Sequence, residues 1–462
     1  MRSFRRTLSA ASSFLSASPA RTAVISFAAV IMLGTLLLML PVSSEQGTWT
    51  SPTDALFTAT SAVCVTGLIV KQTPTYWSTF GELVVLTLIQ AGGLGIMTVS
   101  AFLAVIVRRK LSISFEDMMT EIVESDHTET VWGLIRFICL FTLVAEAIGA
   151  VCLFLSWEQD AGFWHRVYIS IFHAISAFCN AGFSLYNDSL VRYSTSIPVN
   201  AIICTLIVVG GIGFLVVRDI KHYVHWFLFV GKGKRPKLST HSKLVLMVTA
   251  LLLVSAAACI FIMESSGDMA DAPLKERLLT SIFQSVTPRT AGFNTVEISA
   301  QSMAASTAFL LIVLMFIGGS PGSTAGGIKT STLGVMISSI IATLKARTKA
   351  EMFHHSIQEE TVHRVASIIL LSAAALLAGI FLLLITEAHH ASFLEIAFEA
   401  TSAFGTVGLS MGLTFDLTHW GKLIITALMF IGRLGPVTLV LSVGAMEDKT
   451  PYRYPDGQVW VG

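Results

Sequence analysis

Ser61-Ala-Val-Cys-Val-Thr-Gly67-Leu68 is the first of four similar strings that decide the fold of this 462-residue chain. The other copies are Ser176-Ala-Phe-Cys-Asn-Ala-Gly182-Phe183, Ser285-Val-Thr-Pro-Arg-Thr-Ala-Gly292-Phe293, which has one extra residue, and Ser402-Ala-Phe-Gly-Thr-Val-Gly408-Leu409. Their glycines are 115, 110 and 116 residues apart. Self-similarity at a nearly fixed period is the signature of an internal repeat, so we expect four similar units.

Each string follows a segment that is too short to cross a membrane and lies between two long apolar runs. The short segments lie near 52–62, 166–178, 276–286 and 392–403. The long runs lie near 22–42, 80–107, 131–156, 198–217, 242–263, 305–345, 364–386 and 420–444. A span needs about 20 apolar residues, whereas segments of about 10–14 are more often re-entrant or buried. The sequence therefore predicts an all-α integral membrane protein, with four tandem helix–re-entrant pore loop–helix repeats and eight transmembrane helices around one central pore.

The composition agrees with a bilayer as the solvent. Hydrophobic residues make up 53% of the chain and charged residues only 13%, whereas soluble domains are about one quarter charged. The net charge of +1 gives no basic field, so nucleic acid is not expected as a partner. The first run ends at Leu40-Pro41 without a small-x-small cleavage pattern, so we interpret it as a retained span rather than a signal peptide.

The charges of the loops predict the orientation. Basic residues follow the second, fourth and sixth runs: Arg108, Arg109, Lys110, Arg218, Lys221, Lys232, Lys234, Arg235, Lys237, Lys345, Arg347 and Lys349. Cytoplasmic loops carry the excess of Lys and Arg, so both termini should be cytoplasmic and the four short segments should lie on the outer side. The predicted divisions are a cytoplasmic segment 1–21, repeats 22–110, 111–237, 238–350 (with a broken second helix) and 351–446, and a cytoplasmic tail 447–462.

The four loops have the chemistry of a cation filter. Irregular backbone at membrane depth survives only where it is buried in protein or lines a wet cavity. Rings of main-chain carbonyl oxygens can replace the water shell of a cation, as the TVGYG loops of potassium channels do. Glycine permits the positive φ that such a loop requires. The predicted potassium-binding residues are Val65, Thr66, Gly67, Asn180, Ala181, Gly182, Thr290, Ala291, Gly292, Thr406, Val407 and Gly408. The alternative is that small-x-glycine strings only help helices to pack.

The sixth run is interrupted by a glycine-rich string. Residues 318–327 contain five glycines and a proline, which an ordinary transmembrane helix would not tolerate. We expect a flexible constriction beneath the filter, with a kinked packing helix as the alternative. The string is a near miss for a nucleotide P-loop, because Ile328 stands where that motif needs lysine. The predicted gate residues are Gly318, Gly319, Ser320, Pro321, Gly322, Ser323, Thr324, Ala325, Gly326, Gly327, Lys329 and Arg433.

Arg433 lies inside the last run, where a lone cation is costly and normally marks an ion path. Its charge would repel resident cations and speed their release. Pairing with a carboxylate, or with carbonyl groups of the 318–330 loop, is the structural alternative.

Acidic residues deep in the runs are few, with Glu82 and Glu146 as the main candidates. A proton relay would need a chain of such acids. For Glu146 we therefore expect a structural pairing with Arg136 or with a backbone group, and a place in a proton relay is the alternative. His173 and Glu399 lie on the short segments just ahead of their loops. A hydrogen bond that fixes the helix is the expected role for each, and a pore-facing role is the alternative.

These residues together resemble the Trk/Ktr/HKT superfamily of potassium transporters over essentially the whole chain. With eight spans and no additional N-terminal helix pair, the chain is most similar to the KtrB membrane subunits of bacterial Ktr systems. The resemblance implies that Gly67, Gly182, Gly292 and Gly408 are filter glycines and that 318–330 is an intramembrane gating loop. It identifies Arg433 with the family's arginine in the last span.

The resemblance also implies potassium uptake across the bacterial inner membrane by a multi-pass protein. Such subunits form homodimers with one pore per protomer, on a cytosolic ring of KtrA-type subunits that bind ATP or ADP. Potassium is then the permeating ion and sodium an activator, and this chain itself binds no nucleotide. The basic segment Lys232 to Lys243 is interpreted either as docking surface for that ring or as simple positive-inside topology.

Three other functions are alternatives to a potassium filter. An ion-coupled secondary transporter of another small solute needs two inverted halves, whereas this sequence shows four repeats in the same direction. A less selective sodium/potassium pathway would use the same loops. An intramembrane enzyme would need a base beside Ser320 or Ser323, and no histidine or paired acid lies near them in the sequence, so we do not expect an enzyme.

Overall fold

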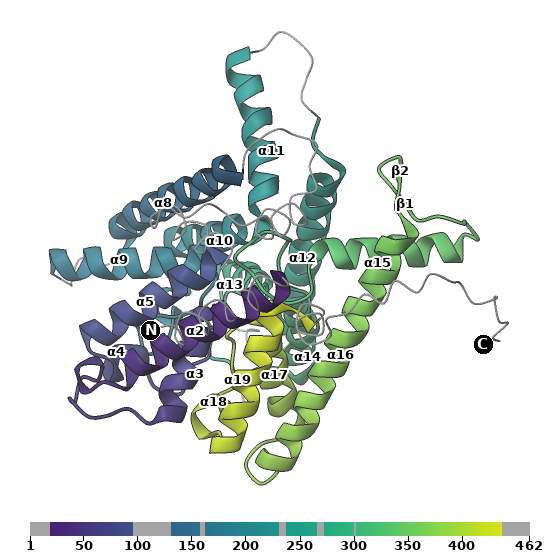
Figure 1. The fold of residues 1–462 in the computed structure, drawn as a ribbon. Helices are drawn as coiled ribbons and strands as arrows, with labels where there is room; N and C mark the ends of the chain where they lie inside the picture. The colour runs from purple at the N-terminus through teal and green to yellow at the C-terminus, as the bar shows by residue number, and fades with distance from the viewer. Residues whose placement is uncertain are drawn as a thin grey trace, which may run out of the picture.

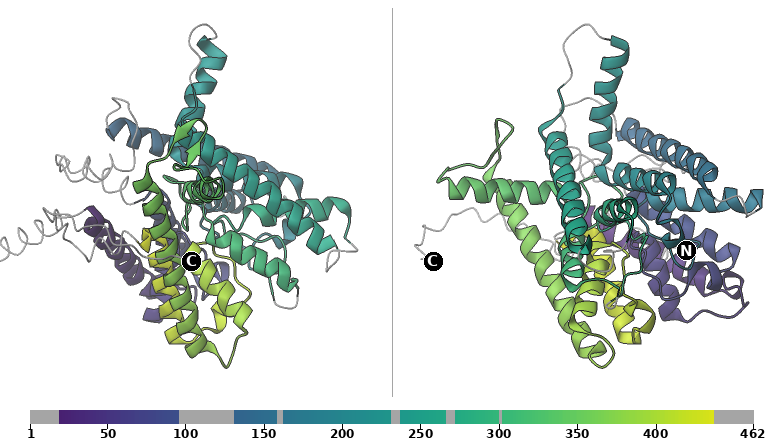
Figure 2. Two further views of the ribbon diagram at one scale, coloured as in Figure 1. Left: turned by 90° about the vertical axis from the view of Figure 1, so that its right-hand side faces the viewer. Right: turned by 180° about the vertical axis from the view of Figure 1, so that it is seen from behind.

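The structure is a computed structural model that describes residues 19–95, 131–157, 162–230, 237–265, 272–299 and 302–436. Its helices spread outward from a common centre, and successive quarters of the chain occupy successive sectors around it (Figures 1 and 2). The predicted terminal segments 1–21 and 447–462 therefore lie almost wholly outside the described residues.

The described part of each quarter contains a long first helix, a short second helix and further helices after the loop. The first quarter has α2 (Pro19–Met39), α3 (Pro52–Val63), α4 (Thr73–Tyr76) and α5 (Thr79–Gly93). The second has α8 (Val131–Ser156), α9 (Phe163–Phe178), α10 (Ile197–Ile212) and α11 (Phe214–His225). The third has α12 (Thr240–Ser265), α13 (Leu274–Val286), α14 (Ala305–Phe316) and α15 (Thr330–Leu344). The hairpin β1 (Glu351–Met352) and β2 (His355–Ser356) precedes α16 (Glu359–Glu387), α17 (Phe393–Gly405), α18 (Leu413–Asp416) and α19 (His419–Leu434) in the fourth.

Residues at the N-terminal ends of the short helices favour the start of a helix there. Pro52 occupies the first position of α3, where its missing N–H and fixed φ cost nothing. At the start of α17, Ser392 and Glu395 form a capping box, with the Glu395 carboxylate 2.8 Å from the N–H of Ser392. These helices therefore begin where nearby residues satisfy the free N–H groups of the first turn.

The quarters pack in a closed cycle around the short helices. Helix α5 packs on α9, α10 on α13, α14 on α17, and α19 on α3. In each case a helix that follows one loop contacts the short helix of the next quarter. This arrangement brings the C-terminal ends of α3, α9, α13 and α17 toward the centre of the molecule.

The run predicted as the fourth span, near 198–217, is sharply bent in the structure. Helix α10 ends at Ile212, and the chain bends by 103° into α11 at Gly213, whose φ is +97°. A Cβ at Gly213 would lie 2.5 Å from the carbonyl oxygen of Pro321, so only glycine fits this close approach. The N–H of Phe214 donates to Gly322 at 3.0 Å, which replaces a bond that a continuous helix would have made.

Three described helices are long and apolar enough to cross a membrane, and the bent pair α10–α11 gives a fourth candidate. They include residues Ile135–Ser156, Thr240–Ser265 and Glu359–Glu387. Shorter apolar helices lie at Val24–Met39, Thr79–Gly93, Ala305–Phe316 and Thr330–Leu344. The predicted spans 80–107 and 420–444 continue beyond the described residues, so the number of eight spans stays a prediction.

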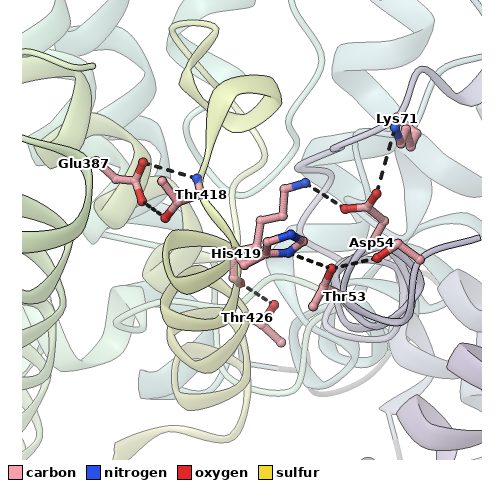
Figure 3. A network of polar contacts seen from close by, with 9 residues as sticks. Thr53, Asp54, Lys71, Glu387, Thr418, His419 and Thr426 are labelled. Atoms are coloured by element: carbon pink, nitrogen blue, oxygen red, sulfur yellow. Dashed lines mark hydrogen bonds and ion pairs between the residues drawn. The ribbon is translucent and has the colours of Figure 1, made fainter. Parts of the chain in front are cut away.

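The first and fourth quarters are not adjacent in the chain, and polar contacts join them where α3 and α19 begin (Figure 3). Asp54, in the first turn of α3, accepts from Lys422 Nζ at 2.7 Å, and Lys71 Nζ lies 3.9 Å from the same carboxylate. Thr53 Oγ1 lies 3.3 Å from His419 Nδ1. We call these residues the outer seam. No short connection of the chain joins the first and fourth quarters, so side-chain contacts must hold them together.

Replacing Asp54 with asparagine should destabilise the protein, because Lys422 would be left without its anion while only 14% of its side chain is exposed. Breaking a buried pair costs about 3–5 kcal/mol, and we expect the lower end of that range here. The measurement is the thermal unfolding midpoint of the purified protein in detergent. Asp188→Asn removes the exposed pair with Arg192 and should change little. Equal shifts in both variants would contradict the role of the outer seam.

Candidate functional site

Each short helix ends in a loop with the same unusual backbone. The first loop residue has a positive φ in all four copies: Val65 (56°), Asn180 (61°), Thr290 (68°) and Thr406 (52°). Two residues later the glycine also has a positive φ: Gly67 (94°), Gly182 (69°), Gly292 (74°) and Gly408 (95°). Positive φ is uncommon for residues other than glycine. The strings predicted it for the glycines only. Val65, Thr290 and Thr406 carry no local signal for it, whereas Asn180 is of a residue type that adopts positive φ more readily than most.

The loop N–H groups face back toward the short helices. The N–H of Thr66 donates to Ser61 O at 2.8 Å, and that of Val407 donates to Ser402 O at 2.8 Å. The second and third loops repeat this bond from Ala181 to Ser176 (2.7 Å) and from Ala291 to Thr287 (3.0 Å). In the first and fourth loops a serine hydroxyl also accepts from the glycine N–H at 3.1 Å. With its donors used on one side, each loop can present carbonyl oxygens on the other.

The four loops contact one another in a closed ring. A Cβ at Gly67 would lie 2.5 Å from Ala181 O, one at Gly182 would lie 2.9 Å from Ala291 O, and one at Gly292 would lie 2.6 Å from Val407 O. A Cβ at Gly408 would meet Thr66 O, which completes the cycle. The structure thus brings all twelve predicted filter residues together. In each case the carbonyl oxygen belongs to the middle residue of the next loop, with the first loop following the fourth.

Three threonine hydroxyls at the ring have unused hydrogen-bonding capacity. Oγ1 of Thr66, Thr290 and Thr406 is buried and has no hydrogen-bond partner within the described residues. A buried hydroxyl without a partner is costly unless something else satisfies it. Carbonyl and hydroxyl oxygens are hard ligands that suit a cation. The chemistry of the ring therefore suits a cation that has lost its water shell.

The glycine-rich string forms a compact loop between α14 and α15, at the interruption expected in the sixth run. Its two ends pair side by side, with the Gly318 N–H donating to Ile328 O at 2.9 Å and the Thr330 N–H donating to Gly319 O at 3.0 Å. Lys329 Nζ donates to Ala325 O at 2.6 Å and closes the loop on itself. We call residues 317–329 the central loop.

The central loop is held against α10 and the second filter loop. The N–H of Ser320 donates to Gly211 O at 3.0 Å, and the Thr324 N–H reaches Gly210 O at 3.3 Å. Thr324 Oγ1 donates to Phe178 O, the last residue of α9, at 3.2 Å. On the opposite side, a Cβ at Gly326 would collide with the Thr406 side chain. The central loop therefore lies directly beside two of the four filter loops.

Arg433 joins the central loop to the first quarter. Its guanidinium donates to Thr324 O and to Gly92 O, each at 2.5 Å. Of the alternatives that the sequence left open, the structure contains the pairing with a carbonyl of the 318–330 loop. No ion pair of Arg433 with a carboxylate occurs within the described residues. The positive charge of Arg433 is thus bound by main-chain carbonyl groups close to the ring.

Glu146 makes side-chain hydrogen bonds, as a structural role predicts, but the predicted partners, Arg136 or a backbone group, are wrong. Its carboxylate accepts from Gln90 Nε2 at 3.3 Å and from Cys179 Sγ at 3.7 Å. Both partners lie on neighbouring elements, α5 and the end of α9, and the sequence gives no sign that these elements meet. Glu82, the other acid, accepts from the Tyr168 hydroxyl at 2.7 Å.

His173 and Glu399 make the helix-fixing hydrogen bonds expected of them. The His173 ring lies 2.9 Å from Ile169 O and 3.0 Å from Ser184 Oγ. Glu399 accepts from Ser410 Oγ at 2.9 Å and from the Thr414 hydroxyl. Each residue therefore ties a short helix to the chain that follows its filter loop.

Comparisons with known proteins agree on one class. A family model described as TrkH, cation transport protein, matches residues 5–450. The chain is 40% identical over 450 residues to the potassium/sodium uptake protein NtpJ of Enterococcus hirae, covering 96% of this chain and 97% of that protein. It is 40% identical over 449 residues to the Ktr system potassium uptake protein B of Bacillus subtilis, with coverages of 96% and 97%.

A solved structure shares the fold. The potassium transporter TrkH from Vibrio parahaemolyticus matches with a TM-score of 0.67, covering 91% of this chain and 85% of that chain. The sequence identity in this match is 18%, so the likeness concerns the fold alone.

Proposed function

The chain belongs to the TrkH family of cation transport proteins, and from this premise we propose that it takes up potassium through the ring of four loops. The observation that carries the proposal is the closed cycle of contacts between loop glycines and the carbonyl oxygens of Thr66, Ala181, Ala291 and Val407. A ring of main-chain oxygens can replace the hydration shell of a cation. The relatives named as potassium uptake proteins support potassium as that cation.

In the proposed architecture, four repeats supply eight transmembrane helices around one pore, in a bacterial inner membrane with both termini in the cytoplasm. Irregular backbone at this depth is tolerated because the loops are buried in protein or line the ion path. The outer seam then lies at the external side, and the basic loops after the second, fourth and sixth runs lie at the internal side.

The central loop and Arg433 form the proposed gate beneath the filter. The loop contacts the fourth filter loop at Gly326 and Thr406, so it can obstruct an ion that leaves the ring. Because Arg433 binds Thr324 O, movement of α19 or of the loop would change the position of a positive charge beside the path. In this proposal, residues 317–329 control opening, and the four loops select the ion.

Regulation is proposed to come from a cytosolic nucleotide-binding ring of KtrA type on a homodimer of this chain, with sodium as an activator. The names of the Ktr relatives, which refer to a system, support a protein with several components. The basic segment Lys232 to Lys243 is the proposed docking surface. Nucleotide then binds the partner and not this chain.

Uptake of rubidium or potassium into liposomes that contain the purified protein tests the proposed function. We expect potassium to enter down its gradient and to be preferred over sodium, with faster uptake when sodium is present. Empty liposomes and liposomes with the protein denatured by heat are the controls. Uptake no faster than in these controls, at any sodium concentration, would contradict the proposal.

A less selective sodium/potassium pathway is the second candidate, and one observation favours it. The relative from Enterococcus hirae is named a potassium/sodium uptake protein. The same liposomes decide between the two, because a non-selective pathway would carry sodium at a rate close to that of potassium when each is the only cation.

A further inference from the structure

A cavity of about 280 Å³ lies away from the filter, between α12, α15 and the segment that leads into β1. Leu251, Ile337 and Ile341 are among its lining residues. The two helices touch near one end of it, since a Cβ at Gly334 would lie 2.5 Å from Leu244 Cδ1. Ligand pockets usually hold roughly 300–1,000 Å³, so this cavity can take part of a flexible molecule.

The apolar wall of the cavity continues onto the surface of the molecule. Leu251 is 62% exposed, Ile337 41% and Ile341 45%. Within the described residues, each of these side chains is therefore only partly covered by protein. In a bilayer their neighbours are hydrocarbon chains, so a chain can enter the cavity from the side without crossing water.

The rim of the cavity is basic. Arg347 and Lys349 line it together with one acid, Glu351, whose carboxylate lies 3.2 Å from Arg347 Nη1. Lys243 Nζ lies 6.0 Å from the ring centroid of Phe353, another lining residue. Lys349 has no ion pair within the part of the chain described here. Three cations against one carboxylate leave an excess of positive charge beside an apolar cleft.

We propose that this cavity binds an anionic phospholipid, with an acyl chain between α12 and α15 and the headgroup phosphate at Arg347 and Lys349. Basic pockets between transmembrane helices on the cytoplasmic side suit such headgroups, and arginine forms paired hydrogen bonds to phosphate oxygens. Helix α15 begins at Thr330, directly after the central loop. A lipid bound against α15 therefore contacts the helix that begins where the central loop ends. The binding itself does not depend on the proposed transport function.

Native mass spectrometry of the delipidated full-length protein tests the proposal. Phosphatidylglycerol is compared with phosphatidylcholine of the same acyl chains and with glycerophosphate, which has no tails. Phosphatidylglycerol should bind at least about tenfold more tightly than phosphatidylcholine, since each basic residue near an anionic headgroup strengthens binding by about fivefold, and Arg347 and Lys349 both line the cavity. Glycerophosphate should not compete. Equal binding of the two lipids, or competition by glycerophosphate, would overturn the proposal.

Matched variants separate this site from general lipid contact. Arg347→Gln with Lys349→Gln should weaken phosphatidylglycerol binding about tenfold, whereas Lys345→Gln with Arg364→Gln removes equal charge outside the cavity and should not. Ile341→Trp should fill the cavity and prevent binding, while Ile340→Trp changes an exposed neighbour on the same helix that does not line it. Equal effects within either pair would contradict the site. Leu251→Cys gives a further test. If two copies cross-link through this cysteine while lipid binding is unaffected, a second copy covers the cavity and the lipid binds elsewhere, which would also contradict the site.

Discussion

Replacing Gly67 with serine should abolish the preference of the protein for potassium over sodium. Gly67 has φ +94°, and a Cβ there would lie 2.5 Å from the carbonyl oxygen of Ala181. A residue with a side chain in such a conformation costs about 1–3 kcal/mol. The steric conflict falls on a carbonyl of the ring itself, so the ring must change its diameter or lose an oxygen. We expect potassium uptake to fall by at least about tenfold, and sodium to pass.

The measurement is the ratio of potassium to sodium permeability in liposomes. Gly412→Ser is the matched control, because Gly412 has φ +100° but nothing within 4 Å of a Cβ. It carries the same backbone strain without the contact with a carbonyl. A Gly67→Ser protein that folds and keeps the parent permeability ratio would count heavily against the four-loop filter.

Replacing Arg433 with glutamine should raise the passive potassium flux of the protein in the absence of its regulator. The guanidinium binds Thr324 O in the central loop and Gly92 O in α5, each at 2.5 Å. Removing it leaves two buried acceptors poorly satisfied, at about 1–3 kcal/mol for each. The central loop should then leave the position seen in the structure about tenfold more often, and the potassium flux should rise in proportion.

Arg433→Lys tests whether the flux depends on the positive charge alone or on the bridge between the two carbonyl oxygens. Lysine keeps the positive charge but lacks the planar fork that reaches two oxygens at once. An intermediate flux is expected, since one contact can be kept. A fall in flux with glutamine, in a protein of normal thermal stability, would contradict the gating role and would favour faster ion release by charge repulsion.

The four loops that follow the short helices were predictable because their signals are local. The serine at the end of each short helix and the glycine six residues later, in the first and fourth copies, share a hydrogen bond within one turn of chain. The interruption at 318–327 was equally visible, since glycine and proline act on the helix that contains them. Each of these features depends on residues that lie within a few positions of one another.

The kink at Gly213 and the partners of Glu146 were missed for the opposite reason. Gly213 sits in an apolar run that reads as a helix, and its positive φ serves the close approach of Pro321 O, far along the chain. Glu146 lies nearer in sequence to Arg136 than to Gln90, yet it bonds Gln90 on another helix. The apolar pattern of a sequence predicts which residues avoid water, but it does not predict which helix packs against them.

By itself the sequence determined the membrane class, the four repeated loops, the glycines at their tips and the broken sixth run. Hydropathy and backbone sterics act over a few residues, and the order of the chain records them directly. Only the tertiary structure decided that the four loops close into one ring, that α10 turns sharply at Gly213, and that Arg433 reaches Gly92, 341 residues away. Such contacts join surfaces whose adjacency depends on the packing of every helix at once, and no short stretch of residues contains that information.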